Sequence, residues 1–256
     1  MRATFATEHT PGRVNEDAVA VGDGWAFILD GATARAGVVS GCVHDVRWLA
    51  STLAGELAQR LLGSQQTLPA LPALPDLLAE SIQATCRQHG PDCDLSNPNS
   101  PSSTAVIARW TSEEFEYLVL ADSPLILDLG RTIRPIIDDR IAHLPDYSAD
   151  GVARSRNQPG GFWVASTNPD AAYQAVTGSV PADEVHRAAL LSDGASRLVE
   201  QFGVLDWLGL VDLLDKPGPA ELIRRTRAAE RAEAPEMAAR RQEKRHDDAT
   251  AILLRR

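Results

Sequence analysis

The chain has 256 residues, of which 44% are hydrophobic, and a formal net charge of −10. This apolar content is enough for a sizeable core and excludes a chain that is disordered throughout. The negative charge argues against nucleic acid as a general partner, and it suits a protein that uses carboxylates to bind cations.

Cysteine usage indicates a reduced, cytoplasmic protein. Cys42, Cys86 and Cys93 are too few for a disulfide framework, and although Cys86 and Cys93 could pair, an odd count in a chain of this length favours free thiols. The cysteines lack the paired spacing of a zinc site, and the histidines show no shared ligand spacing. There is no apolar signal core at the N-terminus and no apolar run of membrane-spanning length, so no membrane association is expected.

The opening of the chain predicts short strands. The β-rich runs cover residues 4–8, 18–21 and 25–29. The last two runs are separated by Gly22-Asp23-Gly24, which is typical of a hairpin.

Two helices are expected next. Apolar residues at helical spacing between Val43 and Leu61 predict the first, with Ser40 as its N-cap and Gly63 as its stop. A Pro-rich linker over residues 67–75 precedes a second helix from Leu77 to Cys86. Each helix has one apolar face, so the pair should pack as a layer on a sheet.

The second half of the chain is dominated by strands. Strands are predicted at residues 104–110, 115–120, 125–129, 132–137, 188–191 and 250–254, and helices at 204–214 and 219–232. A long polar stretch over 138–161 interrupts them, and stretches of this length in a compact domain are usually functional or mobile. The order indicates an α+β fold in which antiparallel sheets are covered by helices, and without an internal repeat or linker we expect one domain over residues 1–256.

Four aspartates lie at the ends of predicted buried strands. Asp30, Asp122 and Asp193 each follow an apolar run, and Asp247 precedes the last one. Strands that end together would gather these carboxylates at one rim, where they would repel one another. A hard divalent cation that prefers oxygen, magnesium or manganese, would relieve that repulsion. Any one such site could be an ordinary turn, and it is the joint pattern that points to a metal centre.

These aspartates belong to a series of short motifs that resembles the protein phosphatase 2C family of metal-dependent protein-serine/threonine phosphatases. The resemblance runs from about Arg13 to Leu254, and the motifs, in family order, are Asn15-Glu16-Asp17, Leu29-Asp30-Gly31, Ser103-Thr104-Ala105, Ala121-Asp122-Ser123, Leu191-Ser192-Asp193-Gly194 and Asp247-Asp248-Ala249-Thr250. It implies a four-layer α/β/β/α sandwich, in which two antiparallel sheets are flanked by helix pairs. It also implies a site for two manganese or magnesium ions.

The resemblance assigns a role to each motif. Asp30 matches the carboxylate that bridges both ions, and Gly31 would offer its carbonyl oxygen to one of them. Asp193 and Asp247 match ligands of the other ion. Water activated between the two cations would attack phosphorus in line, without a covalent enzyme intermediate.

Other matched positions lie around this centre. Asp17, with Glu16, resembles the acidic pair that holds metal-bound water, and Asp122 resembles the residue that helps to bind a third, weaker ion. Asp30, Asp193 and Arg13 are therefore the predicted catalytic residues, with Arg13 gripping the phosphate.

The chain departs from the family pattern where substrate is handled. Arg13 stands one position closer to the Asn-Glu-Asp triplet than usual, and Ala32 replaces a His that is common after Asp-Gly. Ala121 replaces the Gly, and Pro124 the Arg, of the motif around Asp122. Asp248 stands where Asn is usual, which adds a charge beside the metals.

Three functions remain open on this basis. The leading hypothesis is hydrolysis of phosphoserine and phosphothreonine in proteins, with a phosphorylated protein and a cognate serine/threonine kinase system as partners. A non-catalytic phosphatase-like binding module is the alternative that the missing His and displaced Arg favour. A phosphatase of small metabolites is the third.

Other candidate residues suggest no separate chemistry. Ser102-Ser103 lacks the glycine-flanked turn of a nucleophilic serine and is interpreted as a strand start. The arginines at 224, 225, 227 and 231 are interpreted as the solvated face of a helix, and those from Arg240 to Arg245 as a solvated helix end.

Overall fold

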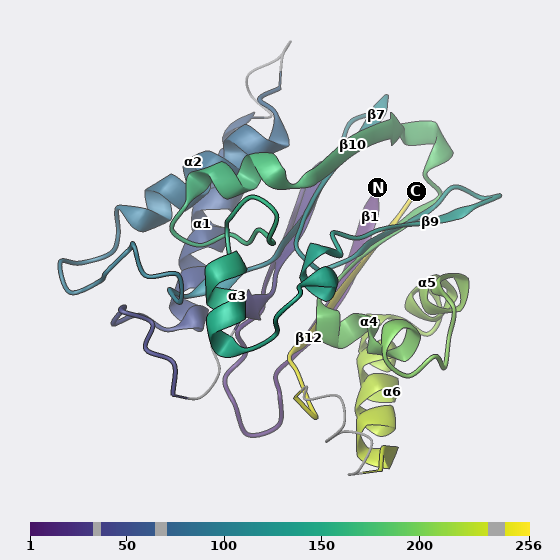
Figure 1. The fold of residues 1–256 in the computed structure, drawn as a ribbon. Coiled ribbons are helices and arrows are strands. Elements are labelled where there is room, and N and C mark those ends of the chain that lie inside the picture. Colours follow the sequence, from purple (N-terminus) through teal and green to yellow (C-terminus); the bar gives the residue numbers. More distant parts are fainter. Residues whose placement is uncertain (33–36, 65–70, 235–243) are drawn as a thin grey trace.

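The computed structural model describes residues 1–32, 37–64, 71–234 and 244–256. Two five-stranded antiparallel sheets lie face to face, and helices cover their outer faces (Figure 1). The predicted α/β/β/α sandwich is confirmed.

The first sheet has the strand order β10-β7-β6-β3-β2. Its strands are β2 (Ala18–Gly22), β3 (Trp25–Leu29), β6 (Ala105–Trp110), β7 (Glu114–Leu120) and β10 (Val176–Pro181). All five residues of β3 are buried, because one face of this strand contacts the second sheet and the other contacts helices.

The second sheet has the order β1-β12-β11-β8-β9. Its strands are β1 (Arg2–Glu8), β8 (Leu125–Asp128), β9 (Ile133–Ile136), β11 (Arg187–Leu191) and β12 (Ala249–Arg255). A small third sheet pairs β4 (Gly31–Ala32) with β5 (Ser102–Ser103), which confirms Ser102-Ser103 as a strand.

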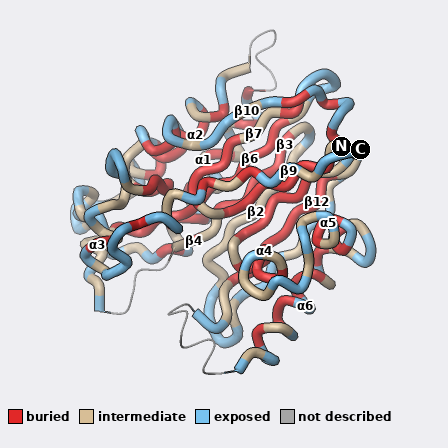
Figure 2. The backbone as a smooth tube through the Cα atoms, turned by 45° about the vertical axis from the view of Figure 1, so that its right-hand side comes forward, coloured by how far each residue is buried: buried red, intermediate tan, exposed pale blue. Residues whose placement is uncertain are grey.

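Each sheet carries its own helix layer. The helices α1 (Val46–Ser64) and α2 (Leu74–Cys86) pack on the first sheet, and α4 (Asp193–Glu200), α5 (Trp207–Asp215) and α6 (Pro219–Ala232) pack on the second. Figure 2 shows the buried residues concentrated in the strands and on the inward faces of these helices. None of the described helices is long and apolar enough to cross a membrane.

Several boundaries differ from those predicted. Ser40 is not the cap of α1, because the Asp45 carboxylate accepts the Trp48 backbone N–H at 2.7 Å and the helix begins at Val46. Neither β10 nor α4 was predicted. β10 is mostly exposed, and α4 is a short helix that begins at Asp193, within the Ser192-Asp193-Gly194 motif that follows the predicted strand.

The polar stretch over residues 138–161 is structured. It contains a 3₁₀ turn, η1 (Arg140–His143), and the short helix α3 (Ala149–Ser155), which Ser148 caps by accepting the Gly151 N–H at 3.0 Å. Of the linker predicted at 67–75, residues 67–70 lie outside the described part, and α2 already begins at Leu74.

Strand register brings distant parts of the chain to one rim of the sandwich. In the first sheet, Ala18 at the start of β2 pairs with Leu29 at the end of β3. In the second, Leu191 at the end of β11 pairs with Ala251 near the start of β12. The segments that precede β2 and β12, and those that follow β3 and β11, therefore meet at the same end.

A buried ion-pair network holds α4 and α6 together behind this rim. Glu230 is completely buried and contacts Arg197 at 3.0 Å, Arg227 at 3.0 Å and His246 at 2.6 Å. The interpretation of Arg227 as a solvated residue is therefore wrong, whereas Arg224 and Arg225 are exposed and pair with Glu221. Helix α6 therefore places Arg227 in the interior, where the buried carboxylate of Glu230 compensates its charge.

We expect Glu230→Gln to lower the free energy of unfolding by about 3 kcal/mol or more, because it removes the fully buried counter-charge that Arg197 and Arg227 share and leaves them only their less buried partners, Asp247 and Glu8. Chemical denaturation would measure it. The matched control is Glu221→Gln on the same helix, whose partners are exposed and whose loss should cost at most about 1 kcal/mol. Equal effects of the two changes would contradict the role given to burial.

Candidate metal centre

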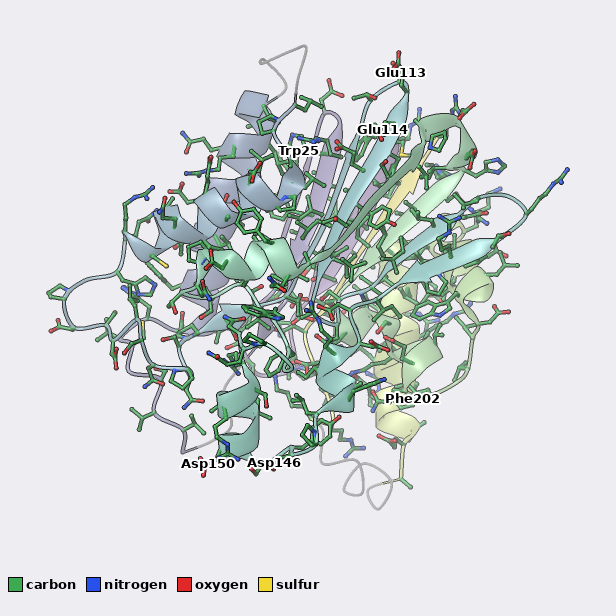
Figure 3. The ribbon with its side chains drawn as sticks, turned by 45° about the horizontal axis from the view of Figure 1, so that its top comes forward. Trp25, Glu113, Glu114, Asp146, Asp150 and Phe202 are labelled. Atoms are coloured by element: carbon green, nitrogen blue, oxygen red, sulfur yellow. The ribbon has the colours of Figure 1, made fainter. Side chains whose placement is uncertain are left out.

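Five aspartates lie at the rim where the strand ends meet. Asp17 precedes β2, Asp30 follows β3, Asp122 follows β7, Asp193 begins α4 and Asp247 precedes β12. In Figure 3, Glu113 and Glu114, at the turn between β6 and β7, mark the opposite end of the sheets. Those two glutamates are exposed, whereas the rim aspartates are partly shielded from solvent.

Asp30 is the electrostatic centre of the group. Burial raises its pKa well above the ordinary value, and the negative charges of four other aspartates raise it further, namely Asp193, Asp17, Asp247 and Asp122. Its Oδ2 accepts the backbone N–H of Asp193 at 3.1 Å, which ties the end of β3 to the start of α4.

Asp193 precedes a glycine that packs directly against the Asp247-Asp248 segment. Burial raises its pKa to about 8, with further contributions from the charges of Asp247 and Asp122, while Arg197 lowers it. A Cβ atom on Gly194 would lie 1.9 Å from the carbonyl oxygen of Asp248. Only glycine fits there, so the Asp-Gly motif of the sequence is explained by close backbone packing rather than by a turn.

Asp17 has one oxygen held and one without a partner. The Thr250 hydroxyl donates to its Oδ2 at 2.6 Å, whereas Oδ1 is buried and has no hydrogen-bond partner among the described residues. Burial raises its pKa to about 7 despite that hydrogen bond, and the charges of Asp248 and Asp247 add to the effect. A buried carboxylate oxygen without a partner is a position that a cation or its water would satisfy.

Asp122 follows a strained turn that the 138–161 segment supports. Ala121 adopts φ 65°, a left-handed conformation in which the family's glycine would be unstrained. The buried Asp138 carboxylate accepts the Ala121 N–H at 3.0 Å and pairs with Arg140 at 2.6 Å. Burial raises the pKa of Asp122, and the charge of Asp138 raises it further.

The donor set fits divalent cations. Carboxylate oxygens are the ligands that magnesium and manganese prefer, and burial and mutual repulsion, the two causes of the raised pKa values, are both effects that a bound cation would offset. Across the described residues, no three of these aspartates have carboxylate oxygens that all lie within 4.8 Å of one another.

A pocket of about 480 Å³ opens beside Asp247. Its lining includes Arg13, Glu16, Asp45 and Lys244, so cationic side chains face an acidic wall. Lys244 also contacts Asp247 at 3.3 Å. Arg13 stands one position closer to the Asn-Glu-Asp triplet than in the family pattern, and it nevertheless lines the same pocket as Asp247.

Gly31 packs tightly behind this pocket. A Cβ atom there would lie 2.5 Å from the Val46 side chain and 2.6 Å from the Glu16 carbonyl oxygen. Any other residue would push apart the β3 end, the first turn of α1 and the Glu16-Asp17 segment, which explains the glycine at this position.

Asp248 has a role that sequence reasoning missed. Its two carboxylate oxygens accept the backbone N–H groups of Thr10 and Glu16, each at 2.6 Å. It therefore closes the loop that carries Arg13 and Glu16 onto the start of β12. The signal in the sequence was the exchange of the usual Asn for Asp, since Asn has only one oxygen with which to accept.

The comparisons with known proteins agree with this architecture. A profile of the family described as protein phosphatase 2C matches residues 7–239, and the chain belongs to that family, whose members are metal-dependent serine/threonine phosphatases. The resemblance that the motifs indicated is thus confirmed. A search of curated protein sequences found no match.

Solved structures with the same fold are distant in sequence. The serine/threonine phosphatase PstP of Mycobacterium tuberculosis is 17% identical, with 98% of this chain and 97% of that chain covered at a TM-score of 0.58. The PPM phosphatase MsPP of Mycobacterium smegmatis, in complex with cacodylate, is 17% identical with coverages of 99% and 97% and a TM-score of 0.55. A PstP catalytic domain in complex with two manganese ions is also 17% identical, with coverages of 98% and 96% and a TM-score of 0.57.

We expect Asp248→Asn to lower the free energy of unfolding by about 1–3 kcal/mol, because one of two backbone N–H groups loses its acceptor. Thermal and urea unfolding would measure the loss, and hydrogen exchange at Thr10 and Glu16 would localise it. Asp183→Asn, at an exposed aspartate, is the control and should change little. Unchanged protection at both amides would contradict the assignment.

Proposed function

We propose that this chain hydrolyses phosphoserine and phosphothreonine in proteins and needs manganese or magnesium to do so. The observation that carries the proposal is the convergence of five aspartates, from motifs far apart in the sequence, at one rim of the sandwich. We also propose that residues 1–256 act as one domain. The cytoplasmic location expected from the cysteine usage stays a prediction.

The roles follow the geometry of the rim. We assign Asp30 as the ligand shared by two ions, since it is the carboxylate on which the other four act. Asp193 and Asp247 would complete one ion's ligands and the Gly31 carbonyl the other's. Asp17 would hold coordinated water through its unpartnered Oδ1.

Asp122 would help to bind a third, weaker ion. Its carboxylate acts electrostatically with Asp247 and Asp138, on the side of the rim next to the 138–161 segment. Leu144 of that segment packs against Ala121 in a small apolar cluster with Phe162 and Val164, which follow the segment. A change of sequence or conformation in this segment would therefore affect the site of the third ion more directly than the site around Asp30.

Bound cations would supply a lowered pKa for water and neutralise charge on the phosphoryl oxygens. The chain's own residues do the positioning. Thr250 fixes Asp17, Asp248 fixes the loop of Arg13, and Arg13 orients the phosphate from the pocket beside Asp247. The phosphorylated protein would enter from this pocket, and a serine/threonine kinase system would supply that substrate.

Two alternatives use the same rim without this reaction. A non-catalytic binding module would bind a phosphoprotein without turning it over, and a metabolite phosphatase would prefer small phosphomonoesters. Ala32 and the shifted Arg13 favour the first alternative, and the retained aspartates favour an enzyme. A comparison of a phosphothreonine peptide, sugar phosphates and p-nitrophenyl phosphate as substrates separates all three.

The decisive experiment is phosphate release from a phosphothreonine peptide with manganese, with magnesium and with a chelator. We expect activity only with added metal, because carboxylates alone provide neither an activated nucleophile nor phosphate neutralisation. Asp30→Asn should abolish turnover while circular dichroism stays unchanged. Full activity of metal-free protein, or of Asp30→Asn, would overturn the proposal.

Arg13→Ala should lower kcat/KM for the peptide by about ten- to hundredfold, the loss expected for one charge-assisted hydrogen bond to phosphate. Steady-state kinetics at saturating manganese would measure it. Arg225→Ala, an exposed arginine on α6, is the control and should leave kcat/KM within about twofold. An Arg13→Ala enzyme that matches wild type would show that another group grips the phosphate.

The Ala32 position predicts a dependence on the leaving group. An alkyl phosphate expels an alkoxide that needs a proton, and a donor there contributes on the order of a hundredfold, whereas an aryl phosphate expels a stable phenolate. We therefore expect the rate of p-nitrophenyl phosphate cleavage, divided by that of phosphothreonine peptides, to be much higher than in family members that keep the His. Ala32→His should raise the peptide rate more than the aryl rate.

His143 is the rival proton donor for that step. Its side chain is 70% exposed and lies 3.7 Å from Asp139, in the η1 turn of the 138–161 segment. If wild type cleaves peptide and aryl phosphate at similar rates and His143→Ala loses only the peptide rate, the donor is His143 and the prediction for Ala32 is wrong.

A further inference from the structure

A cluster of sulfur and nitrogen donors lies outside the acidic rim, where two segments cross at one end of the α1–α2 pair. Residues 37–45 lead into α1, and residues 87–99 follow α2. The Asp94 N–H donates to the Gly41 carbonyl at 2.7 Å, and the Asn97 side chain donates to the Val39 carbonyl at 3.3 Å. These bonds bring Cys42 beside the loop after α2.

Three ligand atoms converge at that crossing. Cys42 Sγ lies 3.3 Å from Cys93 Sγ and 3.4 Å from His89 Nδ1, and one donor atom from each of the three residues lies within 4.8 Å of the others. All three side chains are half-buried. Cys86 takes no part in this cluster and does not pair with Cys93, since its thiol donates to the carbonyls of Ser166 and Thr167.

We propose that Cys42, His89 and Cys93 bind a zinc ion. Zinc–sulfur bonds of about 2.3 Å and zinc–nitrogen bonds of about 2.0–2.1 Å in a tetrahedron place two sulfurs about 3.8 Å apart and a sulfur about 3.6 Å from a nitrogen. The distances here fall a few tenths of an ångström below those values, so a small outward shift of the side chains would admit the ion. Two thiolates and an imidazole are soft donors that select zinc over magnesium or manganese.

The surroundings are those of a metal ligand set. The backbone N–H of His44 donates to Cys42 Sγ at 3.4 Å, a bond that orients the sulfur. Trp48 stacks on the His44 ring at 3.8 Å and meets the His89 ring edge-on at 4.7 Å, which holds both imidazoles in place. In the sequence, only His89-x₃-Cys93 forms a short pair of these donors, and the fold brings Cys42 to it.

A disulfide between Cys42 and Cys93 is the competing chemistry. Bonded sulfurs lie about 2.05 Å apart, whereas these two are free thiols at 3.3 Å. A disulfide also gives no role to His89, whose Nδ1 faces Cys42 and whose Nε2 is buried without a partner among the described side chains. A metal uses all three residues at once.

The proposed ion would hold the segment that leads into α1. Asp45 at its end caps α1 and lines the pocket of the acidic rim, and Val46 packs against the space beside Gly31. Zinc binding would therefore fix one wall of that pocket without contacting it. The proposal does not depend on phosphatase activity.

The test uses cobalt as a spectroscopic substitute for zinc. Full-length protein, reduced and stripped of metal, is titrated with cobalt(II), and thiolate-to-cobalt charge-transfer absorption is recorded in the near ultraviolet. We expect one equivalent to produce the band and one equivalent of zinc to remove it. Cobalt at the acidic rim has only oxygen ligands there and gives no such band, so Asp193→Asn should keep it.

Variants locate the ligands. Cys42→Ser and Cys93→Ser should lose the band, His89→Ala should weaken cobalt affinity at least tenfold, and Cys86→Ser is the matched control that keeps both. Zinc at a hundredfold excess over Kd should raise Tm by about 5–10 °C in Cys86→Ser but not in Cys42→Ser. A fully reduced wild-type protein without the band overturns the proposal, whether or not any variant folds, as does a band that survives both Cys42→Ser and Cys93→Ser.

Discussion

Repulsion among buried carboxylates is the constraint on which the rest of this structure depends. Five partly shielded aspartates lie where strands of both sheets end, and burial, with their mutual repulsion added to it, keeps the pKa values of Asp30 and Asp193 far above the usual range. Such a group is unfavourable in a metal-free protein at neutral pH, because every ionised member destabilises the others. The sandwich can hold it only if the framework behind the rim is independently stable.

That framework is visible in the residues around the aspartates. Hydroxyls, backbone N–H groups and cations surround the rim, as in the donation from Thr250 to Asp17 and the contact of Arg197 with both Asp247 and Glu230. Asp248 is used differently, since both its oxygens are already occupied by backbone N–H groups. The Asp248 carboxylate is therefore already occupied, and its hydrogen bonds distinguish it from the aspartates that we propose as metal ligands.

Much of this could be predicted from the sequence, and the failures have physical causes. Asp30 and Asp193 were found because a buried strand leaves a clear apolar run before the carboxylate. β10 was missed because an exposed edge strand has no such run, and α4 because its first residues are also the Asp-Gly motif. The Cys42–His89–Cys93 cluster joins residues 47 and 51 positions apart, which only the packing of α1 on α2 brings together.

The acidic rim and the Cys42–His89–Cys93 cluster offer different donor atoms for different purposes, and the chain that leads from β3 into α1 connects them. Asp30-Gly31 offers carboxylate and carbonyl oxygens, the donors that magnesium and manganese prefer and that the proposed hydrolytic site would use. Cys42, reached through residues 37–41, carries a sulfur donor suited to an ion that stays bound. Asp45 and Val46 follow Cys42 closely in the chain. Two contacts therefore fix the start of α1 beside the rim: Gly31 packs against Val46, and Cys42 contacts Cys93 in the loop after α2. A change that loosened the sulfur cluster would thus alter the pocket wall at Asp45 before it altered any aspartate of the rim.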